Sequence, residues 1–274
     1  MTTYFRTTEN EFFNNMPEML YKYRVWDNPH HKRLLTDMEL FFPEPKKFND
    51  PYDCGLPFRP DPQDSDPVKI KQKLEELAPR QFPNLIGNPK ALEEEIAKQL
   101  FHILEDPDTY FQQQYGFNKD DLNLMYGVVS LTPHAANFLM WSHYADSHKG
   151  FVIGFDTKKL VKQNLGAVSK VKYSEEIPTV NVLEMDIHLM HRLIYTKAKI
   201  WEYEDEYRIT RINGPNTKAT VNSSALQTVH LGVNMPLTDK FAILEIVKNK
   251  YPNARVYEMT LGKEKFQLIP SHLF

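Results

Sequence analysis

The chain has 274 residues, in which 33 lysines and arginines nearly balance 36 aspartates and glutamates, and it has one cysteine. This length suits one large domain or two small ones, and the balanced charge gives no overall basic field for binding nucleic acid. The lone Cys54 excludes a disulfide framework and a cysteine-based zinc site. We find no secretory signal and no apolar run of the ~20 residues that span a bilayer, so we expect a cytoplasmic protein without membrane contact.

Glycine is scarce, with 10 glycines beside 19 prolines, and neither G-x-G-x-x-G nor G-x-x-x-x-G-K occurs. Loops that cradle phosphates with backbone N–H groups depend on such glycines. A nucleotide bound by this protein would therefore have to be held by side chains.

The first predicted element is a strand over residues 19–25, which is rich in aromatic and branched residues and is stopped by Asp-Asn-Pro. Residues 48–53, FNDPYD, have the composition of a turn. Residues 57–67 contain four prolines and are predicted to be a loop.

Two helices are predicted next, over residues 68–78 and 90–104, from the spacing of their apolar residues. The apolar residues of the second helix recur every fourth position and are predicted to form one buried stripe: Leu92, Ile96, Leu100 and Leu104. Together with the preceding loop, these helices predict a helical insertion over residues 57–125.

Strand patterns dominate the chain after Tyr126. Strands are predicted over residues 126–132, 151–156, 168–174, 203–212, 228–233, 254–261 and 265–269, and helices over 133–145, 182–200 and 237–251. Residues 1–274 are therefore predicted to form a single α+β domain with central mixed or antiparallel sheets and the helical insertion.

The segment around Glu204, Glu206 and Arg208 alternates at period two. In a strand through residues 203–210 these three side chains would share one face, with the two carboxylates roughly 7 Å apart at the backbone. Paired carboxylates repel, and such pairs serve where one steadies a developing cation and the other moves a proton. A solvent-facing strand with Arg208 as a neutralising partner is the structural alternative.

Ser130 and Thr132 stand at the end of the strand over 126–132, where their hydroxyls could bind a ligand or merely cap a turn. Trp141 and Tyr144 follow on the next predicted helix. His143 and His148 lie five residues apart, which does not place them on one helix face, so we expect no metal site.

Arg24 closes the first predicted strand. A guanidinium at such a position can form two hydrogen bonds to phosphate or carboxylate oxygens. An ordinary surface arginine is the structural alternative.

The ordered blocks LYKYR, FNDPYD, WSHYA–HKG–GFD and W-x-x-E-x-E-Y-R resemble a bacterial family of unknown function. The resemblance covers most of residues 18–270 and is weakest over 57–118. The family name implies no activity by itself.

A more distant resemblance connects the chain to ADP-ribosyltransferases of the arginine, serine, glutamate type. In that group an Arg closes the first strand, Ser-x-Ser or Ser-x-Thr stands on a central strand, and Glu-x-Glu opens a later strand. Arg24, Ser130-Leu131-Thr132 and Glu204-Asp205-Glu206 match these parts in order. The gaps between them are wide, and Arg208 is not part of the pattern.

This resemblance implies an ADP-ribosyltransferase-like fold and a reaction on NAD, as in a toxin or a phage-defence effector. Arg24 would bind the NAD phosphates, and Ser130 and Thr132 would support the nicotinamide ribose. Glu206 would stabilise the cation that forms as nicotinamide leaves, and Glu204 would position or deprotonate the acceptor, an unidentified protein or nucleic acid. Trp141 or Tyr144 would wall the nicotinamide pocket.

Two other functions remain open from the sequence. One is a metal-dependent nuclease or other hydrolase that uses His143, Asp146 and His148 with the two glutamates. The other is a non-catalytic binding or sensor domain, in which Trp141 and Trp201 are core residues and Glu206 pairs internally with Arg208.

Overall fold

The computed structural model describes residues 13–56, 59–60, 66–106, 109–110, 113, 121–180 and 189–274. The chain divides into two compact units. The first comprises Met1–Glu44, Tyr126–Val171 and Trp201–Phe274, and the second comprises Pro45–Met125 and Lys172–Ile200.

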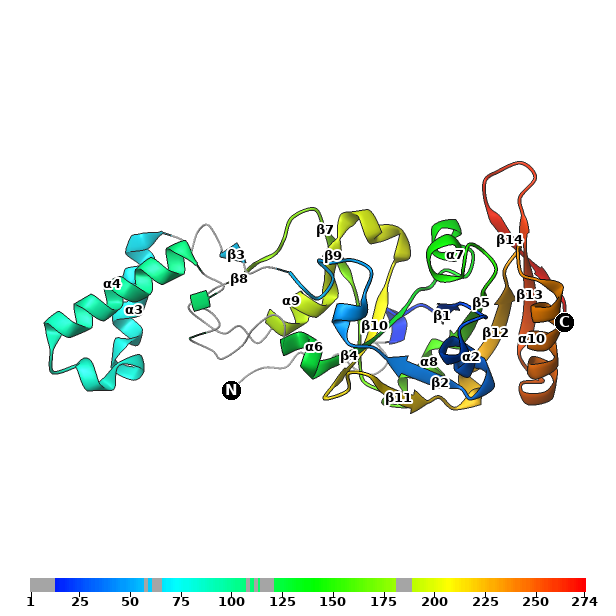
Figure 1. The fold of residues 1–274 in the computed structure, drawn as a ribbon, viewed down its shortest axis with the longest axis horizontal. Coiled ribbons are helices and arrows are strands. Elements are labelled where there is room, and N and C mark those ends of the chain that lie inside the picture. Colours follow the sequence, from blue (N-terminus) through cyan, green and yellow to red (C-terminus); the bar gives the residue numbers. More distant parts are fainter. Residues whose placement is uncertain are drawn as a thin grey trace. The chain divides into compact units, whose positions relative to one another are not determined.

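A five-stranded sheet organises the first unit (Figure 1). Its strands lie in the order β1 (Met19–Arg24), β5 (Phe151–Asp156), β12 (Leu226–Leu231), β13 (Arg255–Leu261) and β14 (Leu268–His272). All neighbours are antiparallel except β12 and β13, which are parallel and are connected by α10 (Leu237–Lys250). Because parallel neighbours need a crossover, this helix returns the chain along the sheet.

A second, antiparallel sheet has the order β4 (Tyr126–Leu131), β10 (Tyr207–Ile212) and β6 (Ala167–Lys170). It is joined to the first sheet where Tyr21 and Thr132 exchange backbone hydrogen bonds of 2.7 and 3.1 Å. Beyond this bridge, Lys22 Nζ donates to the Ser130 carbonyl at 2.6 Å. As a result β1, β4 and β10 lie side by side.

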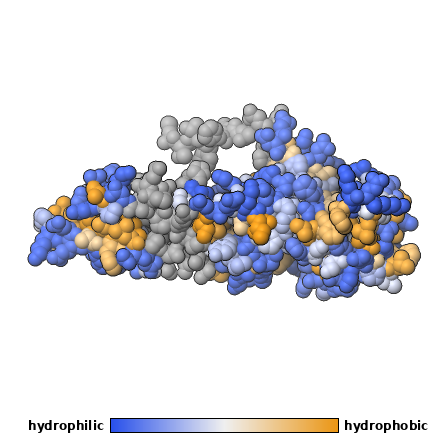
Figure 2. Space-filling view, turned by 90° about the horizontal axis from the view of Figure 1, so that it is seen from above, coloured by the Kyte–Doolittle hydropathy of each residue, from blue (hydrophilic) through white to orange (hydrophobic). Residues whose placement is uncertain are grey.

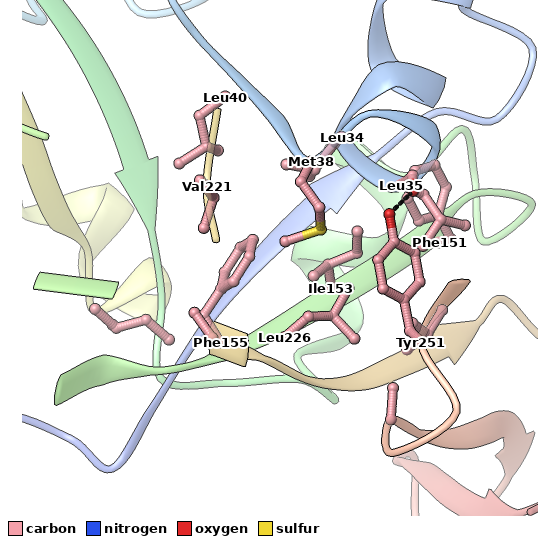
Figure 3. Close-up of a cluster of buried hydrophobic side chains, with 14 of the residues drawn as sticks. Leu34, Leu35, Met38, Leu40, Phe151, Ile153, Phe155, Val221, Leu226 and Tyr251 are labelled. Carbon is pink, nitrogen blue, oxygen red and sulfur yellow. Dashed lines mark hydrogen bonds between the residues drawn. The ribbon is translucent and has the colours of Figure 1, made fainter. Parts of the chain in front are cut away.

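The main core covers one face of these strands. Leu20, Phe151, Ile153 and Phe155 point into it, and the helix α2 (Pro29–Thr36) adds Leu34 and Leu35. Figure 3 shows part of this cluster, including Leu34, Phe151 and Ile153, together with Tyr251, whose hydroxyl donates to the Leu35 carbonyl. Burying each large apolar side chain contributes roughly 1.5–3 kcal/mol, so this cluster accounts for much of the stability of the unit.

The opposite face of the five-stranded sheet packs against α7 (Phe138–Tyr144). Trp141 is fully buried there, donates from its indole nitrogen to the Ala135 carbonyl at 2.8 Å and contacts Tyr23 edge-on at 5.4 Å. Asn137 caps the N-terminus of this helix, because its side chain accepts from the Met140 N–H. The two faces of the sheet are therefore covered by different elements, and a residue's position on its strand decides which environment it meets.

The remaining elements of the first unit are short. A two-stranded sheet pairs β2 (Glu39–Phe42) with β11 (Thr217–Thr220). The others are α8 (Thr157–Val161), the 3-10 helix η4 (Ser223–Ala225), and the 3-10 helix η3 (Lys199–Glu204), which begins in the second unit.

The second unit contains two longer helices that pack on each other, α3 (Pro67–Gln81) and α4 (Pro89–Glu105). Its other elements are short: η1 (Pro45–Lys47), β3 (Arg59–Pro60), η2 (Pro83–Leu85), α6 (Asp121–Met125), β7 (Lys172–Ser174), β8 (Thr179–Val180), α9 (Leu189–Tyr195) and β9 (Thr196–Ala198). The predicted helical insertion, 57–125, lies in this unit, which also takes in residues 172–200.

The mixed α+β class is confirmed, but several boundaries differ from the predictions. The helix predicted over 133–145 begins at Phe138, and the strand predicted from residue 203 begins at Tyr207. In α4 the buried residues are Ile96 and Ile103, and Leu104 is 43% exposed. Steps of four residues drift around a helix of 3.6 residues per turn, so the predicted stripe was wrong at its end.

Over the described part of the chain, no helix combines the length and apolarity needed to cross a bilayer. The face in Figure 2 is mostly hydrophilic, with apolar side chains in small groups between polar ones. Small scattered apolar groups are ordinary on protein surfaces and mark no site by themselves.

Candidate functional site

Glu206 and Arg208 form a buried ion pair at the start of β10. Arg208 Nε donates to Glu206 Oε1 at 2.8 Å, and Arg208 Nη2 donates to Oε2 at 3.1 Å. The exposed fractions are 2% for Glu206 and 0% for Arg208. The two side chains share one strand face, as the alternation predicts. Because both carboxylate oxygens accept from one guanidinium, Arg208 occupies the atoms that a substrate would need.

Glu204 lies before the strand that carries Arg208. It ends η3, and the chain then turns through Asp205, whose φ is 46°, before β10 begins. The Asp205 carboxylate accepts from Lys170 at 2.7 Å, which fixes the turn. The prediction that Glu204, Glu206 and Arg208 lie on one strand face is therefore wrong for Glu204, because a left-handed residue interrupts the alternation.

The Glu204 carboxylate accepts a hydrogen bond of 2.6 Å from the Tyr144 hydroxyl. Glu204 is only 3% exposed, while Tyr144 is half-buried. This bond is at the short end of the range for O–H···O hydrogen bonds. Tyr144 therefore orients the Glu204 carboxylate.

Tyr144 also belongs to an aromatic cluster, which consists of His143, Tyr144, Trp201 and Tyr203. The His143 ring lies 6.1 to 6.2 Å from the other three ring centroids, and its Nδ1 is 3.0 Å from the Tyr203 hydroxyl. Asn137 Nδ2 donates to the Tyr203 carbonyl at 2.7 Å and so ties the start of α7 to η3. All four members of the aromatic cluster are at least partly exposed. The buried carboxylate thus lies next to aromatic rings that reach the surface.

Thr132 serves the backbone turn. It is 1% exposed, and its hydroxyl accepts from the His134 N–H at 3.2 Å. Ser130 is half-buried and lies directly across from Arg208 in the β4–β10 ladder. The Thr132 hydroxyl therefore caps a turn, which was the structural alternative to ligand binding. Ser130 lies next to the buried ion pair.

Arg24 points to the other side of the sheet. It shares its strand face with Leu20 of the main core, whereas Tyr21 and Tyr23 pack toward α7. On β4 and β10 the core residues are Leu131, Tyr207 and Ile209, so their alternates Ser130 and Arg208 face away from the core. The structure thus brings the three strands together but not the three side chains Arg24, Ser130 and Glu206.

Arg24 instead belongs to a basic cluster with Lys22 and His31. Burial lowers the pKa of Arg24 to about 10. Burial and the charges of Arg24 and Lys22 lower the pKa of His31 to about 4, and His31 Nδ1 accepts from the Val25 N–H. Arg24 forms no ion pair within the described residues. Sequence reasoning overlooked Lys22 and His31, although Lys22-x-Arg24 at strand spacing is a signal of two cations on one face.

Trp141 has no exposed surface, so its side chain cannot contact a ligand in this structure and instead packs in the core behind the aromatic cluster. His148 is also turned inward: its Nε2 is 2.9 Å from Ser142 Oγ, and its ring stacks against Trp141. His143 lies at the surface beside Tyr203. Across the described residues, no group of three or more histidine, cysteine or acidic side chains is placed to hold a metal ion.

Comparison with known proteins finds a similarity for one segment of the chain. No curated protein and no solved structure matches. Residues 140–209 match the model of a family described as a protein of unknown function, DUF2971. The match spans the WSHYA–HKG–GFD and W-x-x-E-x-E-Y-R blocks, whereas LYKYR and FNDPYD lie outside it. It contains Tyr144, Glu204, Glu206 and Arg208, and over this segment the chain is similar to a family of unknown function.

Proposed function

We propose that the protein is an NAD-dependent, ADP-ribosyltransferase-like enzyme in which Glu204 is the reacting carboxylate. The observation that carries this proposal is the 2.6 Å hydrogen bond from Tyr144 to Glu204 beside partly exposed aromatic rings. A carboxylate held in place next to aromatic rings suits a reaction that builds positive charge on a sugar.

Glu204 takes the role that the resemblance gives to Glu206. Both oxygens of Glu206 are bound by Arg208, and releasing that carboxylate would leave a buried guanidinium without its partner. Glu204 Oε1 accepts a hydrogen bond from the Tyr144 phenol, which orients the carboxylate. Glu206 and Arg208 then support the strand beside the reacting group.

The chemistry is the loss of nicotinamide from NAD. The glycosidic C–N bond breaks, its electron pair neutralises the pyridinium nitrogen, and positive charge develops on the ribose. The Glu204 carboxylate stabilises that charge. The acceptor, or water, then bonds to the ribose carbon and loses a proton. His143 or Tyr203 can stack on the nicotinamide ring.

The strand arrangement also supports the proposal. β1, β4 and β10 lie side by side and carry in order the Arg, the Ser-x-Thr and the residues that follow Glu-x-Glu. The proposal does not use Arg24, because its side chain lies on the opposite face from Ser130 and Arg208.

A second candidate is a non-catalytic binding domain. Two observations favour it: Trp141 is a core residue, and Glu206 pairs internally with Arg208. Both were expected of this alternative.

The test measures nicotinamide release from NAD, and transfer of labelled ADP-ribose to protein, RNA and DNA, by wild type, Glu204→Gln and Tyr144→Phe. Exposed Glu264 provides the matched control, Glu264→Gln. We expect wild type and the control to release nicotinamide and Glu204→Gln to be inactive while retaining its melting temperature. Equal activity of Glu204→Gln and wild type would refute the proposal. NAD binding without turnover by wild type would favour the binding domain.

A further inference from the structure

One face of the five-stranded sheet carries a second group of aromatic and charged side chains, the Arg255 cluster. Its members come from four strands: Tyr21, His230, Arg255, Tyr257 and His272. One row runs across four strands: Tyr21 pairs with Gly154, Gly154 with Thr228, and Thr228 with Arg255. In the next row, His230 pairs with Tyr257, which pairs with His272. Paired positions share a face, so the cluster forms two adjacent rows on the side of the sheet that α7 partly covers.

The rings of the cluster are held against one another. His230 stacks on Tyr257 with centroids 4.9 Å apart and 14° between the planes, and it meets Tyr21 edge-on at 5.7 Å. His272 meets Tyr257 at 5.2 Å. Tyr21 and Tyr257 remain half-buried and His272 is exposed. The rings thus form an ordered layer with accessible edges.

Gly154 makes this layer possible. A Cβ at this position would lie 2.2 Å from Thr228 Oγ1 and 2.6 Å from Tyr21 Cε1. The Tyr21 ring and the Thr228 hydroxyl therefore lie directly on the backbone of β5.

Arg255 brings an uncompensated positive charge to this layer. It is exposed and forms no ion pair within the described part of the chain, yet its charge acts on both Tyr21 and His230. Glu258, the next acid along β13, pairs with Lys240. An arginine beside aromatic rings, with no acidic partner, suits an anion attached to a planar group.

His230 adds an unsatisfied polar atom. The residue is 4% exposed and its Nε2 lies 3.1 Å from Thr228 Oγ1, but its buried Nδ1 has no hydrogen-bond partner. A buried polar atom without a partner costs free energy, which a ligand can recover.

We propose that the Arg255 cluster binds a nucleoside diphosphate, with the Arg255 guanidinium on the phosphate oxygens and the Tyr257 and His272 rings against the base. Guanidinium groups form paired hydrogen bonds with phosphate, and bases stack on aromatic rings. The cluster lies on the same face as Thr132, which pairs with Tyr21. The inference does not require that the protein cleave NAD.

The experiment is calorimetric titration of the full chain with ADP, using Arg255→Gln, Tyr257→Leu and, as the matched control on the opposite face, Arg24→Gln. We expect wild type and Arg24→Gln to bind ADP alike and Arg255→Gln to bind at least about tenfold more weakly, the loss expected for a charge-assisted contact. Because Arg255 is exposed, Arg255→Gln should fold, and its melting temperature checks this.

Titrations with adenosine and with pyrophosphate test which residue binds which part of the ligand. A titration of Glu204→Gln distinguishes this proposal from the proposed enzymatic function. Tyr257→Leu should weaken adenosine binding more than pyrophosphate binding, and Arg255→Gln the reverse. Glu204→Gln should bind ADP like wild type even if it releases no nicotinamide, which keeps the two proposals distinguishable. Absence of ADP binding to wild type at millimolar concentration, or equal affinity of Arg255→Gln and wild type, would overturn the inference.

Discussion

Arg208 donates two hydrogen bonds to Glu206, two positions before it on the same face of the chain, at 2.8 and 3.1 Å. The pair is buried and lies across from Ser130. Both oxygens of Glu206 accept from Arg208, whereas Glu204, the other buried glutamate of this segment, accepts from Tyr144.

Breaking the pair should destabilise the fold. Arg208→Met leaves Glu206 as a buried charge without this partner, and we expect a loss of about 3–5 kcal/mol in the free energy of unfolding. The double variant Glu206→Gln, Arg208→Met should recover part of that loss. Urea denaturation of wild type, Glu206→Gln, Arg208→Met and the double variant measures the coupling. Additive losses in the double variant would show that the two side chains stabilise the fold independently.

Removing the Tyr144 hydroxyl should affect activity more than stability. Tyr144→Phe deletes the hydrogen bond to Glu204 and keeps the ring, so we expect a stability loss of about 1 kcal/mol. Nicotinamide release should fall roughly tenfold or more, since the Tyr144 hydroxyl no longer helps to orient the carboxylate. Tyr203→Phe is the control, because it also removes one hydroxyl from the aromatic cluster and keeps the ring that could stack on nicotinamide. Equal rates for Tyr144→Phe and Tyr203→Phe would contradict the special role of Tyr144.

Strands with continuous apolar or aromatic runs were predictable, as β1, β4, β5 and β13 show. The start of β10 was not, because the alternation of Glu204 and Glu206 continues through Asp205 although its backbone is left-handed. An alternation of residue types at period two does not reveal a turn in the backbone when that turn is held by a tertiary contact, as the contact of Asp205 with Lys170 holds this one. The contact of Tyr144 with Glu204 likewise joins residues sixty positions apart.

The face of Arg24 could not be predicted either. Lys22 and Arg24 alternate with Tyr21 and Tyr23, and a polar-aromatic alternation does not say which set lies under α2 and which under α7. That choice depends on the pairing of β1 with β5 and on the bridge to Thr132, both long-range contacts. By contrast, the common face of Glu206 and Arg208 was predictable because both positions follow the same local alternation.

Lowering the pH should weaken the fold through His230. Burial and then the Arg255 charge lower its pKa from 6.5 to about 4. Below pH 6.5 the unfolded chain takes up a proton that the folded chain does not accept until about pH 4, so stability falls across this range by at most roughly 3 kcal/mol. Urea midpoints from pH 7 to 4 measure the effect. His230→Gln should flatten the decline, and an unchanged slope would exclude His230 as its source. His31 contributes in the same direction, so His31→Gln is the companion variant.

Substituting Gly154 should disturb the Arg255 cluster specifically. In Gly154→Ala the new Cβ would meet Thr228 Oγ1 at 2.2 Å and Tyr21 Cε1 at 2.6 Å, so the Tyr21 ring must move away from β5. Forcing a methyl group into packed surroundings costs typically ~1–3 kcal/mol. Gly87→Ala is the matched control, because a Cβ there meets nothing within 4 Å, and its stability should change by less than about 0.5 kcal/mol. Denaturation gives both values, and ADP titration shows whether the layer is affected.

If the layer binds the nucleotide, Gly154→Ala loses ADP affinity while Gly87→Ala retains it. Retained affinity in a destabilised Gly154→Ala would mean that the Tyr21 side of the cluster takes no part in binding.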